Sequence, residues 1–250
     1  AKLLEGRIAV LADGSPVVLT IPYLFMENFQ SNEDYYINFY IASFNRILRI
    51  LSFIISFSVP AIYTALVTFH QETIPTTLLL SISTARQGVP FPTIVEIILL
   101  LLSFEMLREA GLRMPNFVGQ ALSIVGALVL GTASVEAKLV SAPIVIIVSL
   151  TAISSLMIPV MESAISILRL LLLLLSAFIG LYGYIFGVMG LMIHLYELRS
   201  FGVPYMMTLI KFEPSELKDT AIRMPWWYIR RRPHLITANR IRQSGGGKSS

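Results

Sequence analysis

The sequence contains no cysteine and only three histidines, and these absences exclude several kinds of site. Without thiols the chain can form neither a disulfide framework nor a thiolate metal centre, and it has no cysteine nucleophile. The histidines stand far apart, at positions 70, 194 and 234, so the sequence predicts no metal site. It contains neither a glycine-rich phosphate loop nor a His-Glu-x-x-His motif. We therefore predict a protein that is not an enzyme and uses no cofactor.

Charged residues are also scarce, at 14%, whereas 55% of the residues are apolar and the mean hydropathy is +0.74. This composition is typical of membrane proteins, in which about 20 apolar residues are needed for a helix to cross ~30 Å of hydrocarbon. The candidate spans are 50–69, 92–108, 116–132, 143–160 and 170–194. The sequence predicts an all-α, polytopic helical membrane protein with broken or re-entrant segments. Four crossings result if 116–132 is re-entrant, and six result if all five candidate spans and 76–87 cross.

The first 30 residues have the pattern of a small β-hairpin. Two β-prone runs, 7–12 and 17–21, flank the turn sequence Asp-Gly-Ser-Pro at 13–16. An isolated hairpin is only marginally stable in water, so we expect 1–30 to be the remnant of a soluble domain that precedes residue 1. The chain begins without Met or a signal-peptide pattern, and we therefore expect a fragment of a longer protein.

Positive charge is concentrated towards the carboxyl end. Residues 205–250 contain nine Lys or Arg against three Asp or Glu, whereas residues 1–204 contain ten against twelve. We predict a helical transmembrane domain over 31–205 and a basic tail over 206–250. The tail should be cytoplasmic, because positively charged flanks favour the cytoplasmic side of a membrane. Arg46 and Arg49 put the start of the first span on the same side. We interpret the aromatic and basic run at 226–233 as a lipid anchor, with the bilayer and not nucleic acid as its partner.

A helix break is predicted near residue 88. Thr76 to Arg86 would form ~16 Å of helix, about half a bilayer. The turn residues that follow are Gly88, Pro90 and Pro92. Broken backbone at membrane depth is tolerated where it is buried in protein or lines a wet cavity, so the break favours a transport or ion pathway. The alternative is an external loop that folds back for packing alone.

Polar residues within the predicted spans are the candidates to line such a pathway. These are Glu96, Glu105, Gln120 and Ser123. A charge at mid-membrane costs about 2.5–3.5 kcal/mol, which makes the glutamates candidates for function. Structural roles are the alternative, because Glu96 lies at the favourable end of its helix dipole and Glu105 can pair with Arg108. Glu162 and Arg169 share a helix face, and we interpret them as a solvated cluster at the membrane surface.

Four glycines recur in the last predicted span. They are Gly180, Gly183, Gly187 and Gly190, and one continuous helix would place them on one face. Such a stripe lets another helix approach closely, so we predict helix–helix packing and, by extension, subunit assembly.

Several stretches form a recognisable set in this order. They are FHQETIP (69–75), QGVPFP with VE (87–96), LREAGLRMPNFVGQALSIVGALVLG (107–131), HLYELRSFGVPY (194–205) and LKDTAIRMPWW (217–227). Together they resemble the A-subunit family of spore germinant receptors, the GerA family of endospore-forming bacteria. The sequence departs from the family pattern at Gln87, Thr132 and Lys138, where Glu, Glu and Gly are usual.

The resemblance implies a multi-pass receptor subunit that couples nutrient sensing to ion release. Its location would be the inner membrane of the spore, which is a cell membrane. It implies assembly with a transporter-like B subunit and a lipoprotein C subunit, and a homo-oligomer of the A subunit around a cation-conducting channel. An accessory family member that amplifies germination is the nearest alternative. A secondary transporter with discontinuous helices is another, although the two halves of the chain show no convincing repeat.

Overall fold

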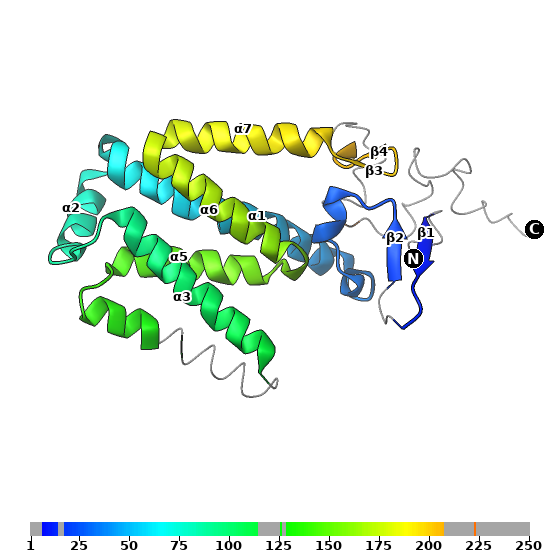
Figure 1. Ribbon diagram of the computed structural model, residues 1–250, viewed down its shortest axis with the longest axis horizontal. Helices are drawn as coiled ribbons and strands as arrows, with labels where there is room; N and C mark the ends of the chain where they lie inside the picture. Colours follow the sequence, from blue (N-terminus) through cyan, green and yellow to red (C-terminus); the bar gives the residue numbers. More distant parts are fainter. Residues whose placement is uncertain (1–6, 15–17, 115–125, 127–128, 208–222, 224–250) are drawn as a thin grey trace, which may run out of the picture. The chain divides into compact units, whose positions relative to one another are not determined.

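The computed structural model describes residues 7–14, 18–114, 126, 129–207 and 223. The described chain is mostly helical, with a small hairpin near the amino terminus, as predicted (Figure 1). It divides into two compact units, one made of 1–51 with 190–250 and the other of 52–189. The predicted segment 116–132, with Gln120 and Ser123, lies largely outside the described residues, as does most of the tail.

The discontinuous unit begins with the predicted hairpin. Strands β1 (Ile8–Leu11) and β2 (Val18–Ile21) pair antiparallel, with Ile8 opposite Ile21. Gly14, at φ 79°, supplies the backbone conformation that the turn needs. Two 3₁₀ turns follow, η2 (Phe25–Phe29) and η3 (Asn32–Tyr35), before the first part of α1. The short strands β3 (Arg199–Ser200) and β4 (Val203–Pro204) complete the unit, and the Phe25 amide donates to the Tyr205 carbonyl at 3.1 Å.

Helix α1 (Phe39–Phe69) is longer than predicted, because it begins eleven residues before the expected start at residue 50. At 1.5 Å per residue its 31 residues extend ~46 Å. Pro60 lies inside the helix, and the Thr64 hydroxyl donates to the Pro60 carbonyl at 2.8 Å. Residues 39–49, ahead of the first predicted span, are therefore part of the same helix.

The second unit contains the predicted helix break. Helix α1 is followed by η4 (Gln71–Thr73) and α2 (Thr76–Ala85), which ends one residue before the predicted end. Gly88, at φ 87°, lies in the turn, and α3 (Thr93–Arg113) starts directly after Pro92. Residues 129–136 are helical and precede α5 (Ala142–Leu156). The core of this unit is formed by Ile97, Leu101, Val140, Ile144, Val148 and Leu173.

The last predicted span, 170–194, is not one helix, and that prediction was wrong. Helix α6 (Glu162–Ile179), which follows the turn η5 (Pro159–Met161), ends at Gly180. Gly180 has φ 72°, a conformation that residues with a Cβ rarely adopt, and a new helix α7 (Leu181–Glu197) starts after it. A glycine at the end of a helix is a known stop signal. The apolar run continues on both sides of Gly180, however, and therefore favoured the prediction of a single span.

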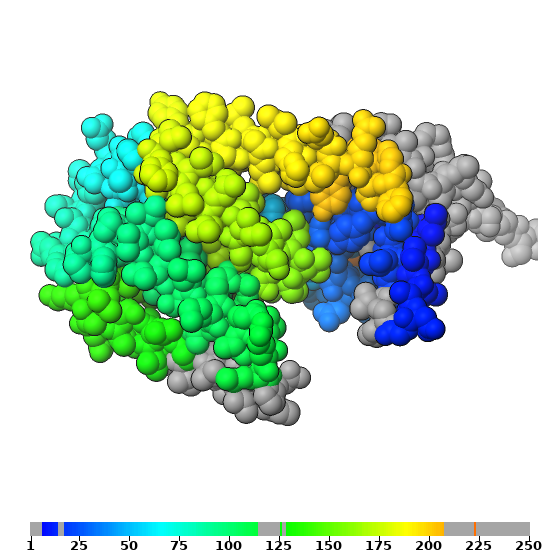
Figure 2. Space-filling model, in the orientation of Figure 1, coloured from blue at the N-terminus to red at the C-terminus, as the bar shows by residue number. Residues whose placement is uncertain are grey.

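Two helical segments, Phe39–Phe69 and Pro159–Ile179, are long and apolar enough to cross a membrane, judged by length and composition among the described residues. Helices α2 and α5 are apolar but shorter. Figure 2 shows α6 at the surface of the second unit. Two large apolar side chains of this helix, Ile167 and Phe178, are exposed. A surface of this kind suits contact with lipid. The number of crossings remains a prediction.

Candidate functional site

Glu96 lies at the helix break and is fully buried, with 0% of its surface exposed. One carboxylate oxygen, Oε2, accepts the backbone N–H of Ser141 at 2.8 Å, and Oε1 lies 3.4 Å from Nη2 of Arg86. Glu96 stands in the first turn of α3, Ser141 is the N-cap of α5, and Arg86 is the C-cap of α2. The carboxylate thus joins three helix ends. Two of these are helix amino termini, whose dipoles favour a negative charge.

Glu105 belongs to a second polar group, which connects α3 with α6. Arg108 lies 2.6 Å from Glu105 within α3, which confirms the predicted pair. Across the helices, the Ser166 hydroxyl donates to Glu105 at 2.6 Å and Arg108 donates to Glu162 at 2.9 Å. Positive and negative charges alternate through this network, so each carboxylate has a cationic neighbour.

Arg169 is the buried member of this network, with 2% of its surface exposed. Its Nη1 lies 3.7 Å from Glu105, and its Nε donates to the Ser56 carbonyl of α1 at 2.9 Å. The interpretation of Glu162 and Arg169 as a solvated cluster was therefore wrong for Arg169. A buried guanidinium between apolar helices needs these partners, because an uncompensated charge there is costly.

The glycines of α7 lie close to α6 of the same chain. A Cβ on Gly183 would lie 2.1 Å from the Leu175 carbonyl oxygen, and one on Gly187 would lie 2.4 Å from Cδ2 of Leu172. Gly190 has nothing within 4 Å, and Gly180 is the turn residue between the helices. Helix α7 also contacts α1, since the Tyr184 hydroxyl donates to the Ser58 hydroxyl at 2.8 Å. The contacts seen at Gly183 and Gly187 are thus within one chain, and a role in assembly remains a proposal.

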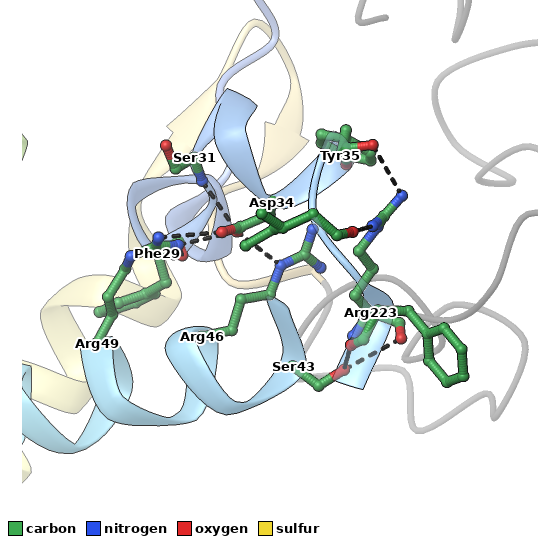
Figure 3. Close-up of polar contacts among 10 residues, drawn as sticks. Phe29, Ser31, Asp34, Tyr35, Ser43, Arg46, Arg49 and Arg223 are labelled. Carbon is green, nitrogen blue, oxygen red and sulfur yellow. Dashed lines mark hydrogen bonds and ion pairs between the residues drawn. The ribbon is translucent and has the colours of Figure 1, made fainter. Parts of the chain in front are cut away.

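Asp34 forms a polar centre in the discontinuous unit and has no exposed surface (Figure 3). Two arginines of α1 reach it: Arg46 Nε donates at 3.1 Å, and Arg49 makes two bonds of 2.8 and 3.0 Å. Asp34 also accepts the Ser31 amide at 3.2 Å. Burial alone would raise the pKa of Asp34, but the hydrogen bonds from Arg49, Ser31 and Arg46 outweigh it and hold the pKa below the ordinary 3.8.

Arg223 docks beside this centre from a position 189 residues further along the chain. Its guanidinium donates to the carbonyls of Ile37 at 3.0 Å and Tyr35 at 3.3 Å, and lies over the Tyr35 ring (Figure 3). Its backbone and the Ser43 hydroxyl exchange hydrogen bonds at 3.1 Å. Arg223 therefore contacts the start of α1 and the turn before it.

A buried ion pair fixes the hairpin to the same unit. Arg7 donates to Glu27 and to the Pro22 carbonyl, and Glu27 accepts the Leu24 amide at 3.1 Å. Nearby, burial, together with the charges of Glu27 and Tyr205, raises the pKa of Tyr23 to about 12. Tyr23 thus stays a neutral hydrogen-bond donor, and its hydroxyl donates to Asn28 at 2.8 Å.

Sequence reasoning selected Glu96 and Glu105 but missed most of their partners. It also missed Asp34 as the partner of Arg46 and Arg49, which it interpreted only as topology signals. The capping-box spacing of Ser31 and Asp34 was visible, but nothing local connects Asp34 to residues 12 and 15 positions away. In the part of the chain that the structure describes, no group of three or more His, Cys, Asp or Glu side chains could hold a metal ion.

Comparison with known proteins gives a consistent result. Residues 1–235 match the family model described as Bacillus/Clostridium GerA spore germination protein. The chain is 50% identical over 245 residues to Spore germination protein KA of Bacillus subtilis (strain 168), covering 97% of this chain and 45% of that protein. It is 41% identical over 238 residues to Spore germination protein GerLA of Bacillus cereus, covering 94% and 48%.

A further relative is named as a membrane protein. The chain is 47% identical over 235 residues to Uncharacterized membrane protein YfkQ of Bacillus subtilis (strain 168), covering 93% of this chain and 46% of that protein. The chain thus spans about half the length of the curated relatives it matches. No solved structure matches it significantly.

Proposed function

The chain belongs to the GerA family of spore germination proteins, and from this premise we propose that it is the membrane part of a germinant receptor subunit. In this proposal it couples nutrient sensing to ion release, as part of an oligomeric, cation-conducting channel in the spore inner membrane. Its partners are further copies of itself, a transporter-like B subunit and a lipoprotein C subunit. The relatives named as spore germination proteins support the role in germination.

The observation that best supports an ion pathway is the burial of charge between apolar helices. Glu96 is fully buried where α2, α3 and α5 meet, and Glu105 is one-quarter exposed beside the buried Arg169. Ionisable groups at membrane depth are costly and are commonly retained for function. A broken helix beside Glu96 adds support, because such backbone is found next to pathways in transport proteins.

Replacement of Glu96 by Gln tests the pathway directly. Gln retains an oxygen for the Ser141 amide and removes the negative charge. If the charge attracts the permeating cation, flux should fall roughly tenfold, since loss of ~1.4 kcal/mol of attraction has that effect. Ion release from germinating spores, or current in reconstituted bilayers, measures it. Glu109→Gln is the control, because Glu109 is exposed and pairs only with Arg113 among the described residues.

Two outcomes separate this proposal from its alternatives. Unchanged cation flux with Glu96→Gln, in a receptor of normal abundance, would make Glu96 a structural link between helix ends. If the protein is an accessory amplifier, deletion of its gene should slow germination in response to every nutrient. It should abolish none of these responses. Loss of the response to one nutrient class supports the receptor role.

A further inference from the structure

A cavity of about 280 Å³ lies beside the helix break in the second unit. It is bounded by α1, by the turn between α2 and α3, by the first residues of α3 and by Ala177 of α6. The polar residues that line it are Thr64, Thr68, Gln71, Arg86 and Thr93. The functional proposal above uses Glu96, which does not line this cavity. The cavity thus has its own, largely polar lining, and it shares Arg86 with the surroundings of Glu96.

Arg86 supplies the positive charge. A guanidinium carries five N–H donors, and among the described residues that of Arg86 forms an ion pair only with Glu96, at the long distance of 3.4 Å. Glu96 in turn is held by the shorter bond from Ser141, at 2.8 Å. Most of the Arg86 donors are thus available to a group in the cavity. Arginine forms paired hydrogen bonds with planar or tetrahedral oxyanions, which a point charge does not.

The start of α3 supplies further donors. Its first amide bonds within the described chain come from Val95 and Glu96, both to the Pro92 carbonyl, so the amides of Thr93 and Ile94 are left without acceptors there. The Thr93 side chain is a second, independent feature. Thr93 is only 4% exposed, lines the cavity, and its hydroxyl makes no hydrogen bond to another described residue. The hydroxyl is therefore open to a hydrogen bond with a group in the cavity.

These donors have a common chemical preference. Helix amino termini bind oxyanions because their free amides and the helix dipole both favour negative charge. At this cavity the amides and the Thr93 hydroxyl come from the start of α3, and the guanidinium comes from Arg86 at the end of α2. Such a set of donors suits the oxygen atoms of a tetrahedral oxyanion. We propose that the cavity binds a phosphate group through Arg86, the Thr93 hydroxyl and the amides of Thr93 and Ile94. A phospholipid headgroup and a free phosphate ion share this chemistry.

Binding to the purified full-length protein tests the site. Inorganic phosphate and dihexanoyl phosphatidic acid, a short phospholipid, are titrated separately by calorimetry. We expect at least one of the two probes to bind. Arg86→Gln should weaken that binding about tenfold through loss of charge-assisted bonds, and Thr93→Val about fivefold through loss of one hydroxyl. Thr84→Val is the matched control, because Thr84 is exposed and donates to the Ser81 carbonyl at 2.9 Å.

The results separate the sources of the ligand and can overturn the site. Binding of inorganic phosphate identifies a soluble anion, whereas binding of the lipid alone identifies a headgroup. Absence of binding for both probes contradicts the proposal. Equal binding by wild type and Thr93→Val also contradicts the proposal. This holds even if Arg86→Gln weakens binding, because the loss of the Arg86 contact with Glu96 could cause that effect indirectly. The readout is binding and not ion flux, so the outcome is independent of the channel proposal.

Discussion

Asp34 pairs with the buried Arg46 and the partly buried Arg49, so its replacement removes the carboxylate that both cations share. Asp34→Asn preserves the size of the side chain and removes its charge. Removal of one partner from a buried ion pair costs about 3–5 kcal/mol, and Arg46 is as completely buried as Asp34. We expect a clear fall in the thermal unfolding midpoint of the full-length protein in detergent. Asp13→Asn is the control, because Asp13 is exposed in the hairpin turn, and an equal midpoint for both variants would contradict this role.

The lowered pKa of Asp34 gives a second prediction, with a defined sign. Because the folded-state pKa lies below the ordinary 3.8, ionisation of Asp34 stabilises the fold at any pH above that value. The contribution is lost as the pH falls through the folded-state pKa. The midpoints of wild type and Asp34→Asn should therefore differ at pH 7 and converge below about pH 3.8. A constant difference from pH 7 to pH 3 would show that charge is not the cause.

Individual residues differ in how far the sequence could predict their contacts. The Glu105–Arg108 pair followed from its spacing of three on a helix, and the place of Glu96 at a helix start followed from Pro92. The Ser141 amide that binds Glu96 lies 45 positions away, and no local pattern indicates it. Arg223 lies in the predicted basic tail, 206–250, and no local pattern indicates that it contacts Tyr35 and Ile37.

Helices α6 and α7 pack so closely that the sequence at their contact should tolerate little change. Gly183→Ala places a methyl group 2.1 Å from the Leu175 carbonyl oxygen, so the backbone must move. Overpacking typically costs about 1–3 kcal/mol, which exceeds the ~1 kcal/mol gain in helix propensity. Gly190→Ala is the matched control, because nothing lies within 4 Å of its added carbon. Thermal midpoints should fall for the first variant alone, and equal midpoints would contradict the close contact.

The two helix breaks show what kind of pattern predicts an element. Gly88, Pro90 and Pro92 form a cluster of breakers, and the structure ends α2 and begins α3 around it. Gly180 is a single residue in a long apolar run, and composition favoured an uninterrupted span there. The difference is physical: proline removes a donor and clashes with the preceding turn, whereas one glycine permits a break without requiring it. Contact with Phe69 and His70, 3.1–3.2 Å from the Cβ position of Gly180, accompanies this break.

At the scale of the whole molecule, the orientation in the membrane depends on charge and on helix length. Helix α1 extends ~46 Å, more than the ~30 Å of hydrocarbon, so a crossing α1 puts its two ends on opposite sides. The basic excess over 205–250 favours the cytoplasm for that end of the chain. Arg46 and Arg49 place the start of α1 on the cytoplasmic side as well. Glu72, just after the other end of α1, should therefore face outward.

Single cysteines test this orientation, because the chain has none of its own. In protoplasts, Glu72→Cys should react with a membrane-impermeant maleimide added outside, whereas Ser249→Cys should react only after the membrane is opened. Protein abundance and reactivity in lysed cells are measured for both variants, so that a poorly folded variant is recognised. Labelling of Ser249→Cys in intact protoplasts would reverse the predicted orientation. Equal labelling of both variants from outside would place residues 72 and 249 on the same side. The number of crossings between them would then be even, whereas the predicted orientation requires an odd number.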